Sequence, residues 1–122
     1  FNDETLLNDL NAIIHPKVAK HFKKWIKKQE GPYCIKEAAI LFESGSYEDC
    51  DLTILVRAPK ELRIKRVLER DQNATVEEIE RRMKNQWTDL DKENLADIII
   101  ENIDLEKTQQ KIKEIHLFLL KT

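Results

Sequence analysis

The chain has 122 residues, of which 41% are hydrophobic and 36% are charged, so we expect a globular protein of one domain or part of one. Its formal net charge of −2 gives no reason to expect nucleic acid or an anionic membrane as a partner. The sequence shows no signal peptide and no apolar run of the roughly 18 residues that a membrane-spanning helix needs. Cys34 and Cys50 are too far apart for a CxxC motif, which favours reduced cysteines and a cytoplasmic location.

The first part of the chain, residues 1–32, is predicted to be helical. Residues 4–14 have an amphipathic pattern, and we expect this helix to break at His15-Pro16 because the residue before a proline is disfavoured in the helical region. Pro16 suits the first turn of a second helix that runs to about Gln29. Its apolar residues recur at helical spacing: Val18, Phe22, Trp25 and Ile26.

Two apolar runs of strand length follow, at residues 33–42 and 52–56. Neither shows a clean polar alternation, which is typical of strands in a parallel sheet that is covered on both faces. We therefore assign residues 33–58 to the core of the sheet.

The rest of the chain alternates helices with one more strand. A helix is predicted from Pro59 to Arg70, and the capping box that starts at Thr75 opens another that runs to about Gln86. Residues 87–94 are polar and are predicted to be a loop. A third strand over 97–101 and an amphipathic helix over 105–120 complete an α/β fold.

Three arginines on the helix after the second strand form a candidate anion site. At about 100° per residue, Arg63, Arg66 and Arg70 fall within a sector of about 60° beside the apolar stripe. The charged residues on the opposite side can pair with each other: Glu61, Lys65 and Glu69. The arginines are then either an ordinary solvated face or a phosphate-binding edge, and the second is favoured because the helix follows the carboxyl end of a strand.

Glu43 and His15 are the other candidates. Glu43 follows the first predicted strand at the same sheet edge, where it could accept a hydrogen bond from a substrate hydroxyl, help to hold a metal-bound water, or cap the next segment. His15 alone is typical of a local helix cap. No HExxH, GxSxG or Cys/His cluster occurs, which excludes metalloproteases, serine hydrolases and zinc sites, and we predict no metal site in this chain.

Taken together, several segments in register resemble the dephospho-coenzyme A kinase family. They are residues 10–18, 37–45 and 58–71, together with Arg82-Met83, Gln86, Lys92, Ala96-Asp97 and Ile100-Glu101-Asn102. The resemblance implies a P-loop kinase of the nucleoside monophosphate kinase type, with a parallel sheet and flanking helices. It also implies transfer of the ATP γ-phosphoryl group to the 3′-hydroxyl of dephospho-CoA, with Mg²⁺.

The resemblance also implies roles for single residues on the substrate side. Residues 1–32 would form the helical part that binds the CoA substrate, and His15 lies within it. Phe42 and Glu43 would border the site of the acceptor hydroxyl.

On the ATP side, the resemblance makes residues 59–96 the lid-type helices and residues 97–122 the last strand with the closing helix. Arg66 and Arg70 would close over the ATP phosphates. Asn102, after the last strand, would lie near the adenine.

The phosphate-binding loop of that family is missing from this sequence. No GxxxxGK[ST] motif occurs, so the phosphate-bridging Lys, the Mg²⁺-ligating Ser or Thr and the catalytic acid that follows them are absent. We therefore predict no catalytic residue in this chain and no kinase activity from it alone. Because the chain starts at Phe1, we expect that a preceding segment has been cut away.

The missing loop has a structural consequence, because in that fold its strand lies between the strands predicted at 33–42 and 52–56. The slot could close by direct pairing of these strands, by self-association with another chain, or by a preceding piece of the protein. Two other functions stay open. The chain could be a stand-alone nucleotide- or CoA-binding or interaction module, or a fragment of another P-loop nucleotide kinase, although His15-Pro16 argues against the latter.

Overall fold

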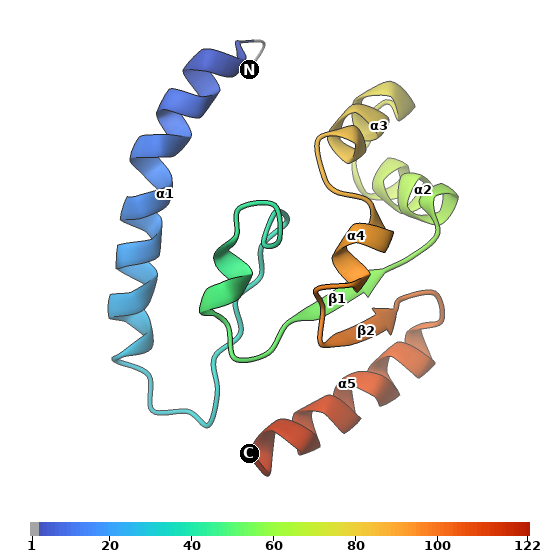
Figure 1. The fold of residues 1–122 in the computed structure, drawn as a ribbon. Helices are drawn as coiled ribbons and strands as arrows, with labels where there is room; N and C mark the ends of the chain where they lie inside the picture. The colour runs from blue at the N-terminus through green and yellow to red at the C-terminus, as the bar shows by residue number, and fades with distance from the viewer. Residues whose placement is uncertain (1–2) are drawn as a thin grey trace. The chain divides into compact units, whose positions relative to one another are not determined.

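The computed structural model describes residues 3–122 (Figure 1). The chain forms two compact units, residues 1–36 and 37–122, where the sequence favoured a single partial domain with a helical part ending at residue 32. Residues 1 and 2 of that helical part lie outside the described residues. The first unit contains one helix, α1 (Glu4–Ile26). The second contains the remaining elements: a 3₁₀ turn, η1 (Ser46–Asp49), then β1 (Ile54–Arg57), α2 (Lys60–Arg70), α3 (Val76–Lys84), α4 (Asp89–Glu93), β2 (Ile98–Glu101) and α5 (Leu105–Leu120).

The predicted break at His15-Pro16 is wrong, because α1 continues through Pro16 as one helix of 23 residues. An interior proline removes one backbone donor and crowds the preceding turn, at a cost of about 3 kcal/mol. The cost is local, and good helix formers on both sides let the helix continue. Asp3 begins the helix, since its side chain accepts a hydrogen bond from the backbone N–H of Leu6 at 3.1 Å.

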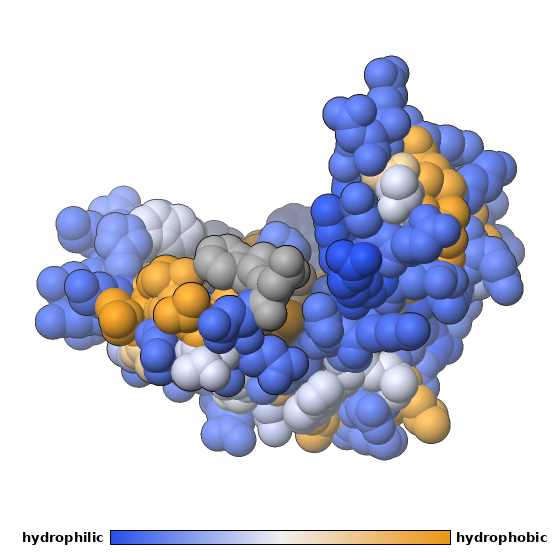
Figure 2. All heavy atoms as spheres, turned by 90° about the horizontal axis from the view of Figure 1, so that it is seen from above, coloured by the Kyte–Doolittle hydropathy of each residue, from blue (hydrophilic) through white to orange (hydrophobic). Residues whose placement is uncertain are grey.

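The apolar side chains of α1 are exposed to solvent. No residue of this helix is buried, and Leu6, Ile13 and Val18 are 63%, 60% and 57% exposed. Figure 2 shows hydrophobic side chains, in orange, on the surface of the molecule among hydrophilic ones, in blue. Among the residues that the structure describes, no helix is long and apolar enough to cross a membrane.

The sheet of the second unit has two parallel strands, β1 and β2, which confirms the α/β class. Ile54 lies opposite Ile98, and the register continues to Arg57 opposite Glu101. Leu55 is buried, whereas its neighbour Val56 is 57% exposed because successive side chains of a strand point to opposite faces. The prediction of a sheet covered on both faces is therefore wrong for β1 within the described chain. The hydrophobic core consists of Phe42, Leu55, Ala58, Ile79, Ile100 and Ile115.

The prediction of a strand at residues 33–42 is also wrong. Residues 33–38 have no regular structure, and residues 39–45 form turns. Backbone bonds there are local: Ser44 N–H donates to the carbonyl of Ile40, and Tyr47 N–H donates to that of Leu41. A strand needs a partner for its backbone groups, and the sheet of the described residues offers it none. Direct pairing of residues 33–42 with β1, one of the three predicted ways to close the slot, does not occur.

The helices of the second unit lie close to their predicted positions, with one exception. α2 and α5 end at the predicted residues, and Thr75 caps α3 by accepting a hydrogen bond from the N–H of Glu78 at 3.3 Å. The exception is the predicted loop at 87–94, which contains α4. Thr88 caps that short helix, which the polar sequence alone did not reveal. Figure 1 shows α4 beside β1, α5 beside β2, and α2 next to α3.

Candidate functional site

The candidate site begins where β1 and β2 end. Arg57, the last residue of β1, donates from Nε to Oε1 of Glu101, the last residue of β2, at 2.7 Å. Its guanidinium also pairs with Glu93 of α4. Three charged side chains thus tie both strand ends to α4, at the sheet edge where open α/β folds bind their ligands.

Arg66 reaches from α2 to the turn that follows β2. Its Nη1 donates to the backbone carbonyl of Asn102 at 2.6 Å, and its Nη2 donates to that of Ile103 at 3.2 Å. The Asn102 side chain is held in turn, because its Oδ1 accepts a hydrogen bond from the Thr108 hydroxyl of α5 at 3.3 Å. Arg66 and Asn102, both predicted on the ATP side, therefore lie in direct contact.

Arg63 and Arg70 have different surroundings on the same helix. Arg63 lies with its Nη2 3.7 Å from a carboxylate oxygen of Asp89 in α4, and its buried Nε has no hydrogen-bond partner in the described structure. Arg70 is exposed at the end of α2 and pairs with none of the described residues. The three arginines share one helix face, as predicted, yet each meets a different environment.

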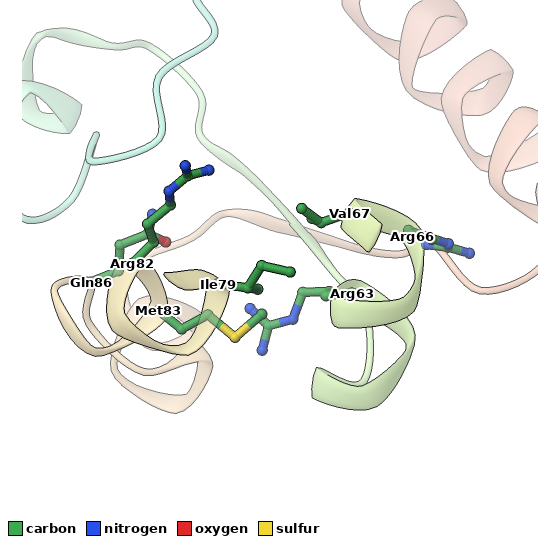
Figure 3. Close-up of a pocket in the computed structure, with 7 residues that line it drawn as sticks. All are labelled: Arg63, Arg66, Val67, Ile79, Arg82, Met83 and Gln86. Carbon is green, nitrogen blue, oxygen red and sulfur yellow. The ribbon is translucent and has the colours of Figure 1, made fainter. Parts of the chain in front are cut away.

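A hollow of about 320 Å³ opens between α2 and α3. Seven residues line it: Arg63, Arg66, Val67, Ile79, Arg82, Met83 and Gln86. Figure 3 shows Arg63 extending from α2 toward Met83 of α3, while Arg66 points away from the space between the helices. The described lining contains guanidinium groups and apolar side chains without a carboxylate, a combination that suits an anion with a flat or apolar part.

Glu43 lies in the turn before η1 and is nearly buried, with 12% of its side chain exposed. Neither carboxylate oxygen accepts a hydrogen bond from the described residues, so Glu43 does not cap the next segment. The Nζ of Lys92 lies 3.6 Å from its Oε2. Phe42, the preceding residue, is buried in the core and packs on Tyr47 with ring centroids 5.4 Å apart.

His15 lies on the exposed surface of α1, in the first unit. It makes no hydrogen bond or ion pair with the described residues, and the helix does not end there, so it is not a helix cap. The other predicted site residues all belong to the second unit.

Asp97, one residue before β2, fastens the start of β1. Its Oδ2 accepts hydrogen bonds from the backbone N–H of Thr53 at 2.7 Å and from the Thr53 hydroxyl at 2.8 Å. These two bonds stabilise the ionised carboxylate and lower the pKa of Asp97, against a smaller opposing effect of burial. The hydrogen bonds between Asp97 and Thr53 hold together the starts of β1 and β2, at the opposite end of the strands from the candidate site.

Sequence reasoning about the site missed Arg82 and Lys92. Both were matched to the family by position, but neither was given a role. The helical period of residues 76–84 places Arg82 beside the apolar residues Ile79 and Met83, which was a usable signal. The sequence gives no sign that Lys92 is functional, because nothing in the polar segment 87–94 shows that its lysine is only 8% exposed.

Comparison with known proteins gives a consistent match. A family model described as dephospho-CoA kinase matches residues 1–107. The dephospho-CoA kinase of Bacteroides fragilis (strain YCH46) is 37% identical over 123 residues, which cover 98% of this chain and 58% of that protein. That of Chlorobium chlorochromatii (strain CaD3) is 36% identical, with the same coverage of 98% and 58%. The chain thus spans about three fifths of the length of these curated relatives.

A solved structure agrees with the fold. The crystal structure of TT1252 from Thermus thermophilus has a TM-score of 0.90 and 29% sequence identity to this chain. The match covers 98% of this chain and 62% of that one. Here too the shared fold belongs to a longer chain.

Proposed function

Because this chain belongs to the dephospho-CoA kinase family, we propose that it is the part of such an enzyme that closes over the ATP phosphates and borders the acceptor hydroxyl. The complete reaction moves the γ-phosphoryl group of ATP to the 3′-oxygen of dephospho-CoA, releasing ADP and the hydroxyl proton. Such a transfer depends on positioning and charge stabilisation, which arginine side chains supply well.

The observation that carries the proposal is the hollow between α2 and α3. Arg63 of α2 and Arg82 of α3 line it, and the remaining lining includes apolar residues and the polar Gln86. Guanidinium groups match phosphate oxygens in a bidentate way. Arg70, which has no partner among the described residues, lies at the end of α2 and is a further group for the phosphates.

We assign the adenine side to the turn after β2. Arg66 holds the backbone carbonyls of Asn102 and Ile103, so this turn is fixed relative to α2. In this role Arg66 acts mainly by placing Asn102 and its neighbours, whereas Arg82 and Arg70 are the freer groups for phosphate. His15 remains proposed for the CoA side, and the buried Phe42, which precedes Glu43 in the chain, remains proposed for the acceptor site.

Magnesium is part of the proposed reaction as a companion of ATP. Among the described residues there is no group of three or more His, Cys, Asp or Glu side chains that could hold a metal ion. Mg²⁺ that accompanies ATP is commonly held by one or two carboxylates together with the phosphates and water, and we give the ion no protein ligand here. We place the activity in the cytoplasm, consistent with the unpaired state of Cys34 and Cys50.

A reconstituted enzyme tests the proposal. The segment of the Bacteroides fragilis protein that the match leaves uncovered is joined ahead of this chain, and ADP release is measured with ATP and dephospho-CoA. We expect activity from the joined protein and none from the 122-residue chain alone, since its sequence lacks the phosphate-binding loop.

A matched pair of variants then tests the hollow. Arg82→Met should raise the KM for ATP about tenfold, because a charged hydrogen-bond donor to phosphate is lost. Arg81→Met, on the same helix but outside the lining, should leave it unchanged. A joined protein without dephospho-CoA kinase activity, or equal effects of the two substitutions, would contradict the proposal.

A further inference from the structure

The Glu43 carboxylate is an acceptor that the described fold does not use. Both of its oxygens are buried, and neither receives a hydrogen bond. Burying a carboxylate without hydrogen bonds is costly, so proteins rarely keep one unless a ligand or a partner completes it. The free acceptor capacity therefore points to a group that is added from outside the chain.

Lys92 is the cation that faces this carboxylate. Its side chain is 10% exposed, and its Nζ lies 3.6 Å from Oε2 of Glu43, which is close enough for charge attraction and too far for a hydrogen bond. The pair thus offsets charge without occupying the lone pairs of Glu43.

Lys92 is held in place by the ion pairs of its own short helix. Asp89, at one end of α4, lies 3.7 Å from Arg63 of α2, and Glu93, at the other end, pairs with Arg57 of β1. A helix of five residues is not stable alone, so these contacts fix where the Lys92 ammonium lies. Its place is set by the sheet edge and by the helix that carries the candidate phosphate arginines.

We infer that Lys92 is a positioning residue, which holds the Glu43 carboxylate ready to accept a hydrogen bond from an O–H group of the bound reactants. This inference rests on the proposed function. Two O–H donors share the required chemistry there: the ribose hydroxyl of dephospho-CoA and a water bound to Mg²⁺. Lys92 itself touches neither.

The reconstituted enzyme described above gives the test, with Lys65→Met as the matched control. Lys65 also forms a pair with a glutamate, at 4.0 Å from Glu69, but that pair is exposed on α2. Lys92→Met should lower kcat/KM for dephospho-CoA at least about tenfold with the KM for ATP unchanged, because only the orientation of Glu43 is disturbed. Lys92→Arg should recover part of this loss, and Lys65→Met should have no effect.

A charge exchange separates positioning from a merely structural ion pair. The double variant Glu43→Lys with Lys92→Glu keeps two opposite charges but moves the carboxylate onto α4. A structural pair predicts that this variant folds and works like the unsubstituted enzyme, which would overturn the inference. Positioning predicts a folded enzyme, shown by its circular dichroism and melting temperature, with the tenfold or larger loss retained. This variant shows whether the carboxylate must be at position 43 even where Lys92→Met does not fold, and the partial recovery by Lys92→Arg reports on the role of Lys92.

Titrations of the two reactants identify the O–H donor. A raised KM for dephospho-CoA at saturating Mg²⁺ assigns the hydroxyl, and a raised Mg²⁺ requirement at saturating dephospho-CoA assigns the metal-bound water. Full activity of folded Lys92→Met under both conditions would overturn the inference. An inactive unsubstituted enzyme would instead overturn the proposed function, and with it the ligand assigned to Glu43.

Discussion

Arg63, Arg66 and Arg70 show how much a single side chain depends on its surroundings. They share a helix and a face, yet Arg63 lies near Asp89, Arg66 donates to backbone carbonyls, and Arg70 has no partner among residues 3–122. The Arg66 guanidinium, which donates to the Asn102 carbonyl at 2.6 Å, connects two elements of the fold. The exposed guanidinium of Arg70 is available to a ligand. The chemistry of each arginine is therefore decided by the neighbouring element it reaches.

Asp97 gives a pH-dependent prediction at the same scale. Hydrogen bonds from Thr53 lower the pKa of Asp97 in the folded chain, so the ionised carboxylate favours folding. This contribution is fully present above the unfolded pKa of about 3.9 and is lost as the pH falls through the lower, folded pKa. We expect urea unfolding to show Asp97→Asn as less stable than the unsubstituted chain at pH 6, with a difference that shrinks below about pH 4. A constant difference across this range would contradict the assignment.

At the scale of elements, side-chain caps mark where α3, α4 and α5 begin. Thr75, Thr88 and Asp104 each accept a hydrogen bond from a backbone N–H of the first turn that follows, which satisfies a donor that the helix leaves free. For α3 this cap fixes the helix that bears one wall of the hollow. The start of α3 was predictable because the signal is local in sequence.

We expect Thr75→Ala to lower the free energy of unfolding by about 1 kcal/mol, the usual value of such a cap. Thr75→Ser, which keeps the hydroxyl, should have almost no effect. Urea unfolding followed by circular dichroism measures both. Equal stability of the alanine and serine variants would show that the Thr75 hydroxyl does not contribute to the start of α3.

At the scale of the whole molecule, the sheet is small for its fold class. Within the described residues it has two strands, so each strand has one neighbour, and Val56 is exposed on one face. Unpaired strand edges and exposed apolar residues favour association with another chain. The sequence analysis predicted self-association for the same reason, namely that strands of the sheet lack a neighbour.

We therefore expect the 122-residue chain to associate as its concentration rises, measured by sedimentation velocity. Val56→Lys should weaken this association, because a charge on the exposed face opposes close packing. Leu117→Lys, on the exposed surface of α5, is a control for added charge alone. A chain that stays monomeric at every concentration would contradict the prediction.

The sequence predicted those features that depend on local pattern. The ends of α2 and α5, and the presence of strands near 52–56 and 97–101 in a parallel sheet, follow from apolar periodicity and the order of elements. The strand at residues 33–42 was wrong because a strand requires a partner, which no local pattern supplies. The break at Pro16 was wrong because the residues on both sides outweigh one lost hydrogen bond.

The candidate site was predictable to a similar degree. Helical angles placed the arginines on one face, but not their partners on other elements. The buried state of Lys92 depends on the fold as a whole, since α4 is stabilised by residues that lie far away in the sequence. Contacts of this kind are not visible in a segment read alone.

α4 has one further consequence, for experiments in solution. Since this helix is too short to form alone, its amide hydrogens are protected from exchange only while its distant partners stay in place. The amides of Lys92 and Leu95 donate to the carbonyls of Thr88 and Lys92. Their hydrogen-exchange rates therefore report whether the contacts of α4 with other elements are intact. A change at the sheet edge, in α2 or in the turn that contains Glu43 should raise the exchange rate of these α4 amides, and the measurement needs no ligand or label.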